Sequence, residues 1–547
     1  MDPPATYISS SELRKHNTRN DAWISIHGKI YDVSSWLHRH PGGALPLLTV
    51  AGTDATDAFL AFHPPSSAAA LLPAFSTGLL LSDYAVSAAS SDYRKLHSKL
   101  SELNLFERKG HTTLILLSLI LTLLPLCVCG VVFSDSTFVH LLSGALIGFL
   151  WIQSGWIGHD SGHYNVMLNR RFNRVAQILS GNVLAGISIA WWKWNHNAHH
   201  IACNSLDFDP DLQHLPFFVV SSKFFNSLTS QFYDRKLNFD SLARFLVSYQ
   251  HWTYYPVMCF ARVNLFAQSF FLLLSNRKVE SRGIEVLGLL AFWVWYPLLV
   301  SFLPNWWERV LFVVVSFSVT GIQHVQFCLN HFSSKVYLGP PSGGDWFEKQ
   351  TNGTLDVSCS AWMDWFHGGL QFQVEHHLFP RLPRCHLRKI APLVKDLCKK
   401  HNLPYNCVSF WKANVLTIQT LRNAALQARD GSGPAPKNLI RTRLRYSFIE
   451  ASGVVFSSEL EFYFGNLPGL ANLILEIVKK ETTDTGHAWL RKVKFHFSMV
   501  TTTEVEDSGA VVQYFREHKC LITAIVGHSK GQIQLSFTTS KLKFFGD

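Results

Sequence analysis

The chain has no cysteine before Cys127, and its ten cysteines are scattered through 547 residues without paired spacing. Cys127 and Cys129 lie inside an apolar run. This pattern excludes a disulfide framework and a zinc ribbon, and it fits domains that face the reducing cytosol. The polar N-terminus also lacks the apolar core of a secretory signal peptide.

Charged residues make up only 16% of the sequence, whereas hydrophobic residues make up 48% and aromatic residues 13%. This apolar share is high for a soluble protein, so we expect membrane-embedded segments. The formal net charge is +11. Basic residues beside apolar runs more often hold a membrane protein against anionic lipid than bind nucleic acid. We therefore expect a lipid partner and no nucleic acid.

Three histidine clusters border the long apolar runs. They contain seven histidines, which are His159, His163, His196, His199, His200, His376 and His377. The first cluster has the spacing i, i+4 and the second has the spacing i, i+3, i+4. The third cluster has histidine at the last two positions of the second spacing. Each spacing puts the imidazoles on one face of a helix. One metal cannot use all seven, but two can, and a nitrogen-rich site without thiolates suits iron, zinc or copper. A lone histidine is usually structural, but three clusters at membrane flanks predict a metal centre at a membrane surface.

The N-terminal part contains a second pattern of histidines. Residues 23–33 alternate in polarity and predict a strand hairpin that turns near residues 27–28. His40 is followed by Pro and two Gly, which stop regular structure, and His63 comes after a stretch at 52–62 that we expect to be helical.

Two imidazoles that face each other across an apolar slot can ligate a haem iron from both sides. Such a haem has no open position for O2, so it carries electrons. The alternative interpretation is two unrelated histidines in a small α+β domain. His38 is the competing ligand, but we expect it on the surface.

The three clusters resemble the histidine boxes of the membrane fatty acyl and sphingolipid desaturases, which bind two irons. Gln373 at the start of the third box resembles the front-end subgroup, which carries a fused cytochrome b5 domain. The His-Pro-Gly-Gly motif, followed by His63, is similar to cytochrome b5, and this resemblance implies that His40 and His63 are the axial ligands of haem b. Within this subgroup the chain resembles the plant sphingolipid Δ8 long-chain base desaturases, with plant Δ6 acyl desaturases close behind.

The resemblance implies eight histidine ligands for the two irons. Seven come from the boxes, and the family leads us to expect one more, for which we choose His331 over His324 because it follows the last apolar run at the cytosolic edge. Gln373 is a further candidate, although an amide oxygen is a poorer ligand than a neutral imidazole. Carboxylates that could fix the imidazole tautomers are Asp160, Asp207, Asp209, Asp211 and Glu375. We expect His214 and His367 to be structural or to support the ligands.

Apolar runs at 114–133, 139–157, 284–302 and 310–329 predict four membrane spans in two hairpins. The hairpin loops are poor in Lys and Arg, so the N-terminus, the boxes and the C-terminus should face the cytosol. The stretches 175–192 and 254–274 are also apolar, but a crossing by either one alone would separate the boxes. The second stretch contains Arg262 and Asn264, which are costly at mid-bilayer. We interpret both as interfacial or half-buried helices.

The fold expected is an α+β cytochrome b5-like domain (8–83), a linker (84–111) and an all-α, four-span desaturase domain with a cytosolic cap (112–439). The remaining residues, 440–547, have one expected helix at 470–480 and strand-like runs at 492–500, 510–515 and 532–537. This extension is either an accessory α+β segment or the product of a faulty gene model.

The resemblance implies an O2-dependent desaturase that introduces a Δ8 double bond into the long-chain base of sphingolipids. The reaction needs two electrons, which the fused haem domain would supply one at a time. A tethered donor has a high effective concentration. Since the sequence has no flavin or nucleotide motif, the haem should be reduced by a separate NADH-cytochrome b5 reductase. The resemblance also implies that the protein resides in the endoplasmic reticulum membrane. The alternatives are a Δ6 acyl-lipid desaturase, a b5-fused lipid hydroxylase and a non-enzymatic haem carrier.

Overall fold

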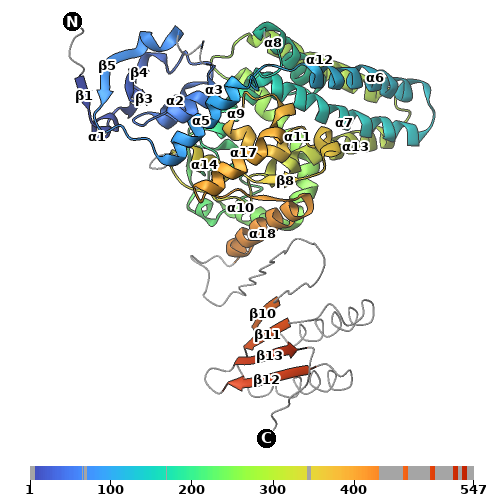
Figure 1. Cartoon of the computed structure of the whole chain (residues 1–547). Coiled ribbons are helices and arrows are strands. Elements are labelled where there is room, and N and C mark those ends of the chain that lie inside the picture. The colour runs from blue at the N-terminus through green and yellow to red at the C-terminus, as the bar shows by residue number, and fades with distance from the viewer. Residues whose placement is uncertain are drawn as a thin grey trace. The chain divides into compact units, whose positions relative to one another are not determined.

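The computed structural model of the chain describes residues 6–64, 66, 70–167, 169–341 and 346–429, together with four strands beyond residue 459 (Figure 1). The chain divides into two compact units, Met1–Gly431 and Ser432–Asp547, and each is described by itself.

The first unit begins with a five-stranded sheet in the order β1-β5-β4-β3-β2. Its strands are β1 (Thr6–Ile8), β2 (Asn17–Thr18), β3 (Asp21–Ile26), β4 (Lys29–Asp32) and β5 (Ser76–Leu81). The predicted hairpin is confirmed, because β3 and β4 pair antiparallel across His27 and Gly28. Both turn residues have positive φ, 52° and 76°, as a two-residue hairpin of matching twist requires.

Short helices pack beside this sheet. They are α1 (Ser10–Leu13), α2 (Ala44–Val50) and α3 (Thr56–Phe62). The helix expected at 52–62 therefore forms only from Thr56, since Gly52 has a φ of 77° and belongs to a turn. This α+β arrangement is the one that the sequence predicts for the N-terminal domain.

Most of the predicted linker is the helix α5 (Ala88–Glu102), which packs against its neighbours. Tyr93 on α5 is fully buried, and its hydroxyl donates a hydrogen bond of 2.9 Å to the carbonyl of Leu378. The same hydrophobic cluster includes Ile24 of the N-terminal sheet and Val374 of the third box. The N-terminal domain is therefore joined to the rest of the unit by a continuous apolar core.

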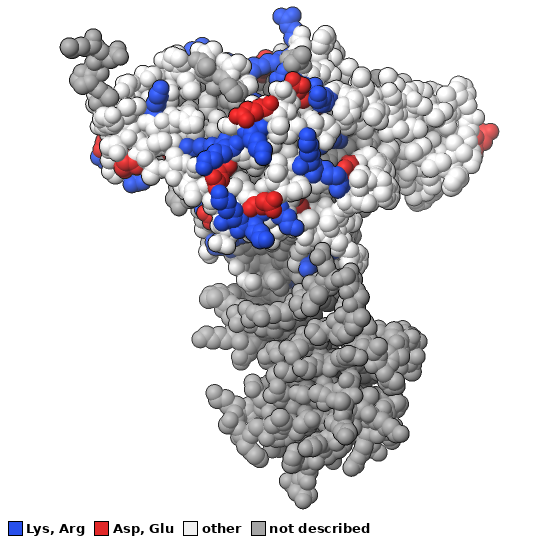
Figure 2. Space-filling model, in the orientation of Figure 1, with Lys and Arg blue, Asp and Glu red and all other residues white. Residues whose placement is uncertain are grey.

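Among the residues that the structure describes, five helices are long and apolar enough to cross a membrane. They are α6 (His111–Phe133), α7 (Thr137–Gly162), α11 (Gln250–Leu274), α12 (Arg282–Ser301) and α13 (Trp306–Leu329). The four predicted spans correspond to α6, α7, α12 and α13. Figure 2 shows almost no charged side chains over this part of the molecule, whereas Lys, Arg, Asp and Glu gather over the rest of the unit.

The predicted count of four spans is not exact, because α11 also qualifies. One of the two sequence arguments against this span is the cost of Arg262 and Asn264 at mid-bilayer, but the structure buries Arg262 inside the protein, where it is 1% exposed. Its guanidinium donates to the carbonyl of Ala185 and lies 4.0 Å from the centroid of the Trp151 ring. The protein, rather than lipid, solvates the cation.

The apolar stretch at 175–192 does not form one straight helix. It is divided among α8 (Arg170–Gln177), a π-helical segment (Ile178–Leu184) and α9 (Ile189–Ile201), and the two arms are bent by 109°. The buried carboxylate of Glu285 holds the bend by accepting hydrogen bonds from the Ser188 hydroxyl and the Ala190 backbone N–H. If this bent pair were one span, the total would be six.

Close packing of α7 against α13 is possible because position 148 is glycine. A Cβ at Gly148 would lie 2.3 Å from the carbonyl oxygen of Ser316, which is far inside van der Waals contact. The hydroxyl of Thr320 on α13 donates to the carbonyl of Gly148 at 3.2 Å. The two helices whose ends carry the first box and His331 are thus fixed against each other.

Shorter helices make the cap over the apolar bundle. They are α10 (Ser241–Ser248), α14 (Trp346–Gly353), α15 (Asp364–His367), α16 (Gln373–Leu378), α17 (Leu387–Lys400) and α18 (Phe410–Arg429). Small two-stranded sheets pair β6 (Thr229–Ser230) with β7 (Arg235–Lys236) and β8 (Asp356–Ser358) with β9 (Cys407–Ser409).

The second unit contains a four-stranded sheet in the order β10-β11-β13-β12. Its strands are β10 (Leu460–Gly465), β11 (Val493–Ser498), β12 (Leu521–Gly527) and β13 (Gln532–Thr538). The predicted strands at 492–500 and 532–537 correspond to β11 and β13, whereas β10 and β12 were not predicted. The expected helix at 470–480 and strand at 510–515 lie outside the described residues.

Candidate metal centres

His40 and His63 face each other in the N-terminal domain, with ring centroids 6.1 Å apart. Each ring is oriented by a backbone carbonyl. The Nδ1 of His40 lies 3.0 Å from the oxygen of Gly43, and the Nδ1 of His63 lies 3.1 Å from the oxygen of Phe59. With the proton on Nδ1, the Nε2 of each ring keeps a free lone pair.

This pair fits a haem iron. Two imidazoles on opposite sides of one metal, each bound at about 2.0–2.1 Å, have ring centroids roughly 6 Å apart. Burial lowers the pKa of His40, and burial together with the nearby His40 lowers the pKa of His63 to about 4, so both rings are neutral at physiological pH. The two glycines support the geometry, because a Cβ at Gly42 would lie 2.9 Å from the His40 ring and Gly43 has a φ of 86°.

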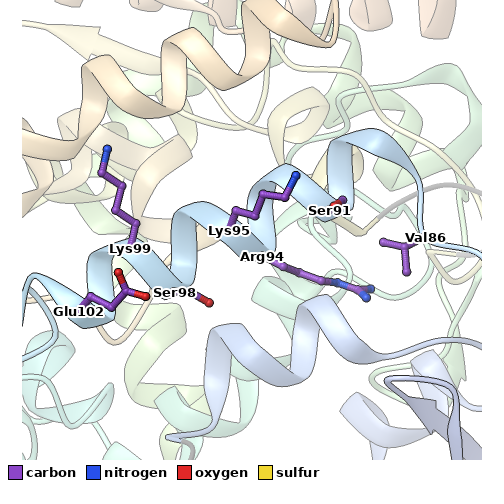
Figure 3. Close-up of a pocket in the computed structure, with 7 residues that line it drawn as sticks. All are labelled: Val86, Ser91, Arg94, Lys95, Ser98, Lys99 and Glu102. Atoms are coloured by element: carbon purple, nitrogen blue, oxygen red, sulfur yellow. The ribbon is translucent and has the colours of Figure 1, made fainter.

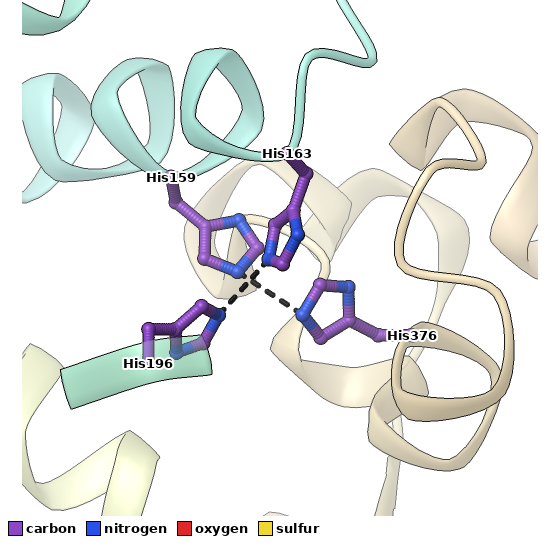
Figure 4. A group of neighbouring side chains, drawn as sticks. All are labelled: His159, His163, His196 and His376. Atoms are coloured by element: carbon purple, nitrogen blue, oxygen red, sulfur yellow. Dashed lines mark hydrogen bonds between the residues drawn. The ribbon is translucent and has the colours of Figure 1, made fainter. Parts of the chain in front are cut away.

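The first group of box histidines converges where α7, α9 and α16 meet. His159, His163, His196 and His376 each offer one nitrogen, and these four nitrogens lie within 4.8 Å of one another (Figure 4). The Nε2 atoms of His163 and His196 are 3.0 Å apart, and those of His159 and His376 are 3.1 Å apart. His200 belongs to the same side, since its Nε2 lies 3.0 Å from that of His196.

A second group lies next to the first. It brings together His199, His331 and His377, with the thiol of Cys203 beside them. The Nε2 atoms of His199 and His377 are 3.2 Å apart. The amide of Gln373 lies 3.0 Å from the Nε2 of His331 and 3.2 Å from that of His377.

The structure therefore brings together all eight histidines that the sequence analysis selects, and it separates His324 from them. The Nδ1 of His324 lies 3.3 Å from the carbonyl of Met258 on α11, and His324 belongs to neither group. Of the two candidates for the ligand outside the boxes, His331 is the one that lies beside the box histidines.

The donor set of both groups fits metal ions. Two nitrogens bound at neighbouring positions of one metal, at about 2.1 Å each, are about 3.0 Å apart, which matches the separations of the Nε2 atoms. Burial lowers the pKa of His163, His376 and His377 well below the usual range, so these rings are neutral and offer lone pairs to one another. Each neutral imidazole keeps one unprotonated ring nitrogen, and several such nitrogens at these separations form a donor set that suits a metal ion.

Two of the predicted carboxylate supports contact a box histidine with good geometry. Asp209 accepts from the Nδ1 of His199 at 2.9 Å, and Asp211 lies 3.6 Å from the same nitrogen. Asp160 lies 3.1 Å from the Nδ1 of His159. In the described residues, Asp207 and Glu375 have other partners. Asp207 accepts from Ser205 and Gly339, and Glu375 accepts from the hydroxyl of Tyr405.

Two supports were missed by the sequence analysis. The side-chain oxygen of Gln350 lies 2.8 Å from the Nδ1 of His377, and the carbonyl of Gly353 lies 3.1 Å from the Nδ1 of His331. Both come from α14, which has no box motif. No spacing pattern in the sequence links this helix to the boxes, so only the tertiary structure could identify it.

The remaining candidate histidines lie outside both groups. The Nε2 of His214 contacts the backbone carbonyl of Asp211, and His367 lies 3.5 Å from the amide of Gln326. His38 is exposed, as expected. A surface hollow of about 480 Å³ lies on α5 between Val86 and Glu102, and none of the residues that line it belongs to a histidine group (Figure 3).

A family model described as fatty acid desaturase matches residues 136–409, and one described as a cytochrome b5-like heme/steroid binding domain matches residues 9–81. The chain is 61% identical over 434 residues to Delta(8)-fatty-acid desaturase 2 of Arabidopsis thaliana, a match that covers 79% of this chain and 96% of the relative. It is 62% identical over 434 residues to acyl-lipid (9-3)-desaturase of Borago officinalis, covering 79% and 97%.

A more distant relative, Delta 8-(E)-sphingolipid desaturase of Emericella nidulans, is 39% identical over 299 residues, which is 53% of this chain and 54% of the relative. These matches confirm the resemblance that the histidine boxes and the His-Pro-Gly-Gly motif indicate. They also agree with the apolar helices of a membrane protein. The chain is an oxidoreductase of the fatty acid desaturase family that carries a cytochrome b5-like domain at its N-terminal end.

Proposed function

We propose that this protein introduces a Δ8 double bond into the long-chain base of sphingolipids, with O2 as the oxidant and electrons from its own haem domain. The observation that carries the proposal is the presence, in one compact unit, of a two-imidazole pair and of two groups that, together with His200 beside the first, hold eight imidazoles. The names of the relatives support the position of the double bond, since the Arabidopsis relative is a Delta(8) desaturase and the Emericella relative a Delta 8-(E)-sphingolipid desaturase.

In this proposal His40 and His63 are the axial ligands of haem b, and two irons are held by the histidine groups. The first iron is assigned to His159, His163, His196, His200 and His376, and the second to His199, His331 and His377. When bound, these metals supply the oxidising power, together with O2, that removes hydrogen from an unactivated methylene. The amide nitrogen of Gln373 faces the second group, and after a flip of this amide its oxygen would be the atom that binds a metal there, directly or through water.

The residues of the chain hold and orient the ligands. Asp209, Gln350 and the Gly353 carbonyl keep the proton of three imidazoles on Nδ1 and direct Nε2 at the metal. His199, His200 and His377 are at most 2% exposed, so bulk water is excluded from their rings. Exclusion of water protects an oxidant from side reactions.

The position of the double bond requires a fixed distance between the polar end of the substrate and the metals. A headgroup bound near the cytosolic interface, with the chain running past the metals, would provide that distance. Two polar ends satisfy this geometry: the amino-diol of a sphingoid base and an acyl ester. The second candidate function, a Δ6 front-end acyl-lipid desaturase, rests on the name of the Borago relative, which acts on an acyl lipid and is as similar as the Arabidopsis one.

The same proposal includes the domain boundaries, the reductase partner and the location of the protein. The cytochrome b5-like domain spans about residues 8–83, the linker 84–111 and the desaturase domain 112–439, and residues 440–547 have no assigned role. An NADH-cytochrome b5 reductase would reduce the haem. The protein would reside in the endoplasmic reticulum membrane with both termini in the cytosol, since the hairpin loops are poor in Lys and Arg.

The substrate is tested by expression in a yeast that makes neither product, with long-chain bases and fatty acids analysed from the same cells. We expect 8-unsaturated phytosphingosine and an unchanged fatty-acid profile, and the His199→Ala variant should give neither product. New Δ6-unsaturated fatty acids with unchanged bases would establish the acyl-lipid function instead. A hydroxylated base or acyl chain without a new double bond would indicate the lipid hydroxylase.

A further inference from the structure

The last helical residue of α3 lies between the two metal sites. Phe62 directly precedes His63 in the chain, so the backbone links its side chain to one proposed haem ligand. On the other side, the Phe62 ring lies edge-on to the ring of His200, with centroids 6.0 Å apart and an interplanar angle of 88°. A single aromatic side chain therefore connects a haem ligand with a histidine of the first iron group.

The contact is held by the residues that follow the third box. Arg381 donates hydrogen bonds to the carbonyls of Ala61 and Leu60, at 3.1 and 3.3 Å, which closes the free end of α3. The ring of Trp346 covers another side of Phe62, with centroids 6.1 Å apart. The contact of Phe62 with His200 is thus held by packing and by hydrogen bonds. Because the two domains are already in contact here, His63 and His200 need not be brought together by diffusion of a tethered domain.

We propose that Phe62 is the bridge through which electrons pass from the haem to the iron site, with entry at His200. This inference rests on the proposed function. In each transfer the haem iron loses one electron and the iron site gains one, and two such transfers accompany each O2. No proton moves at Phe62, because its ring has none to exchange. The protons that balance the water come from solvent.

A rival route starts on the other side of the haem pair. A Cβ at Gly42 would lie 3.7 Å from the side-chain nitrogen of Asn197, and one at Gly43 would lie 4.0 Å from the ring of Trp194. The loop after His40 therefore also approaches α9. Trp194, however, stacks on Phe232 with centroids 4.0 Å apart and has no ring contact with any of the eight histidines in the described residues. The Phe62 route is the one that ends directly on a proposed ligand.

The bridge is tested in the full-length protein loaded with haem and iron. The haem is reduced without oxygen, substrate and O2 are then added together, and reoxidation of the haem is followed by its absorption. Phe62→Ala opens a gap between His63 and His200, and electron tunnelling falls steeply across a gap. We expect a fall in the reoxidation rate of several-fold or more, toward the rate of a His376→Ala protein, with the reduced spectrum and iron content unchanged.

Two further variants separate electron transfer from docking. Phe62→Leu retains most of the packing volume, so it should fold and give an intermediate rate. Phe106→Ala makes the same size of change at the same interface, where the Phe106 ring contacts His97, Phe379 and Arg381 but has no ring contact with the eight histidines in the described residues, and it should leave the rate unchanged. Equal losses in Phe62→Ala and Phe106→Ala, a wild-type rate in both Phe62 variants, or a loss in Trp194→Ala alone would overturn the bridge. If the wild-type haem reoxidises no faster than that of the His376→Ala protein, the haem does not deliver electrons to the iron site. That result would refute the proposed function rather than the choice of Phe62 as the bridge.

Discussion

The haem pair and the iron groups position their imidazoles in opposite ways. In the haem pair, each ring is oriented by a carbonyl three or four residues away, at Gly43 for His40 and at Phe59 for His63. In the second iron group, the orienting atoms come from other parts of the chain, since Gln350 is 27 residues from His377. The pair of His40 and His63 is therefore a local structure, whereas the second histidine group forms only after the helices have assembled.

The two sites also differ in how many donors they offer. Two axial nitrogens complete a haem iron and leave it no position for O2, which suits an electron carrier. The two histidine groups together hold eight imidazoles, which is more than a single metal ion can bind. The difference in donor number therefore matches the division between electron supply and oxidation of substrate.

The largest expected effect comes from a change in the iron groups. His376→Ala removes one of the four nitrogens of the first group, so iron should be lost and desaturation abolished. The haem spectrum should stay normal, because the haem ligands are oriented locally. The measurements are iron content, the reduced absorption spectrum and product formation in one preparation.

The matched control for that change is His214→Ala, which removes a histidine outside both groups. This variant should retain its iron and the larger part of its activity. Desaturation that persists in His376→Ala would refute the ligand assignment, and loss of the haem spectrum in that variant would refute the independence of the two sites.

The second-largest effect is expected from loss of a proposed haem ligand, and free cytochrome b5 should partly reverse it. His63→Ala should abolish the reduced haem spectrum while the iron groups keep their metal, because no iron ligand is oriented by the haem pair. Desaturation should fail for lack of electrons and recover in part when free cytochrome b5 is supplied. His38→Ala changes an exposed histidine two residues before His40 and should have no effect on the spectrum. A normal spectrum in His63→Ala would disprove the haem assignment.

A smaller effect is expected from the distant support Gln350. Gln350→Leu removes the acceptor for the Nδ1 proton of His377, and loss of such a support typically lowers metal affinity by about 10–100-fold. Gln350→Glu keeps an oxygen acceptor at the same position and should retain more iron. The measurement is iron retained after dialysis against a graded series of chelator concentrations. Equal retention in wild type and Gln350→Leu would show that His377 does not need this orientation.

Much of both sites could be predicted from the sequence because their ligands are periodic or are marked by turn residues. The spacing of the boxes identifies one helix face, and the Pro and glycines after His40 identify a place where regular structure stops. The sequence favours His331 over His324 only because His331 follows the apolar run. In the structure, His331 lies in the second group and His324 lies in neither group. Gln350 and Gly353 could not be found, because periodicity relates residues on one helix and not contacts between distant helices.

The predicted number of spans is not exact, for a physical reason of the same kind. Arg262 argues against a span if lipid surrounds it, but the carbonyl of Ala185 and the ring of Trp151 surround it instead. Hydropathy contains no information on such partners. The bend within 175–192 likewise depends on Glu285 of another helix.

The smallest expected effect concerns Gln373, the one position where the third box departs from histidine. Its amide lies 3.0 Å from the Nε2 of His331 and 3.2 Å from that of His377, so the side chain already points at the second group. Gln373→His replaces this amide with a neutral nitrogen donor in the same direction, so iron should be retained and desaturation reduced less than by Gln350→Leu. Gln373→Leu, which offers no donor, is the matched comparison and should lose more activity than Gln373→His. If the leucine variant were as active as wild type and the histidine variant inactive, position 373 would serve to leave space for the substrate or O2, and its amide would have no part in holding the metal.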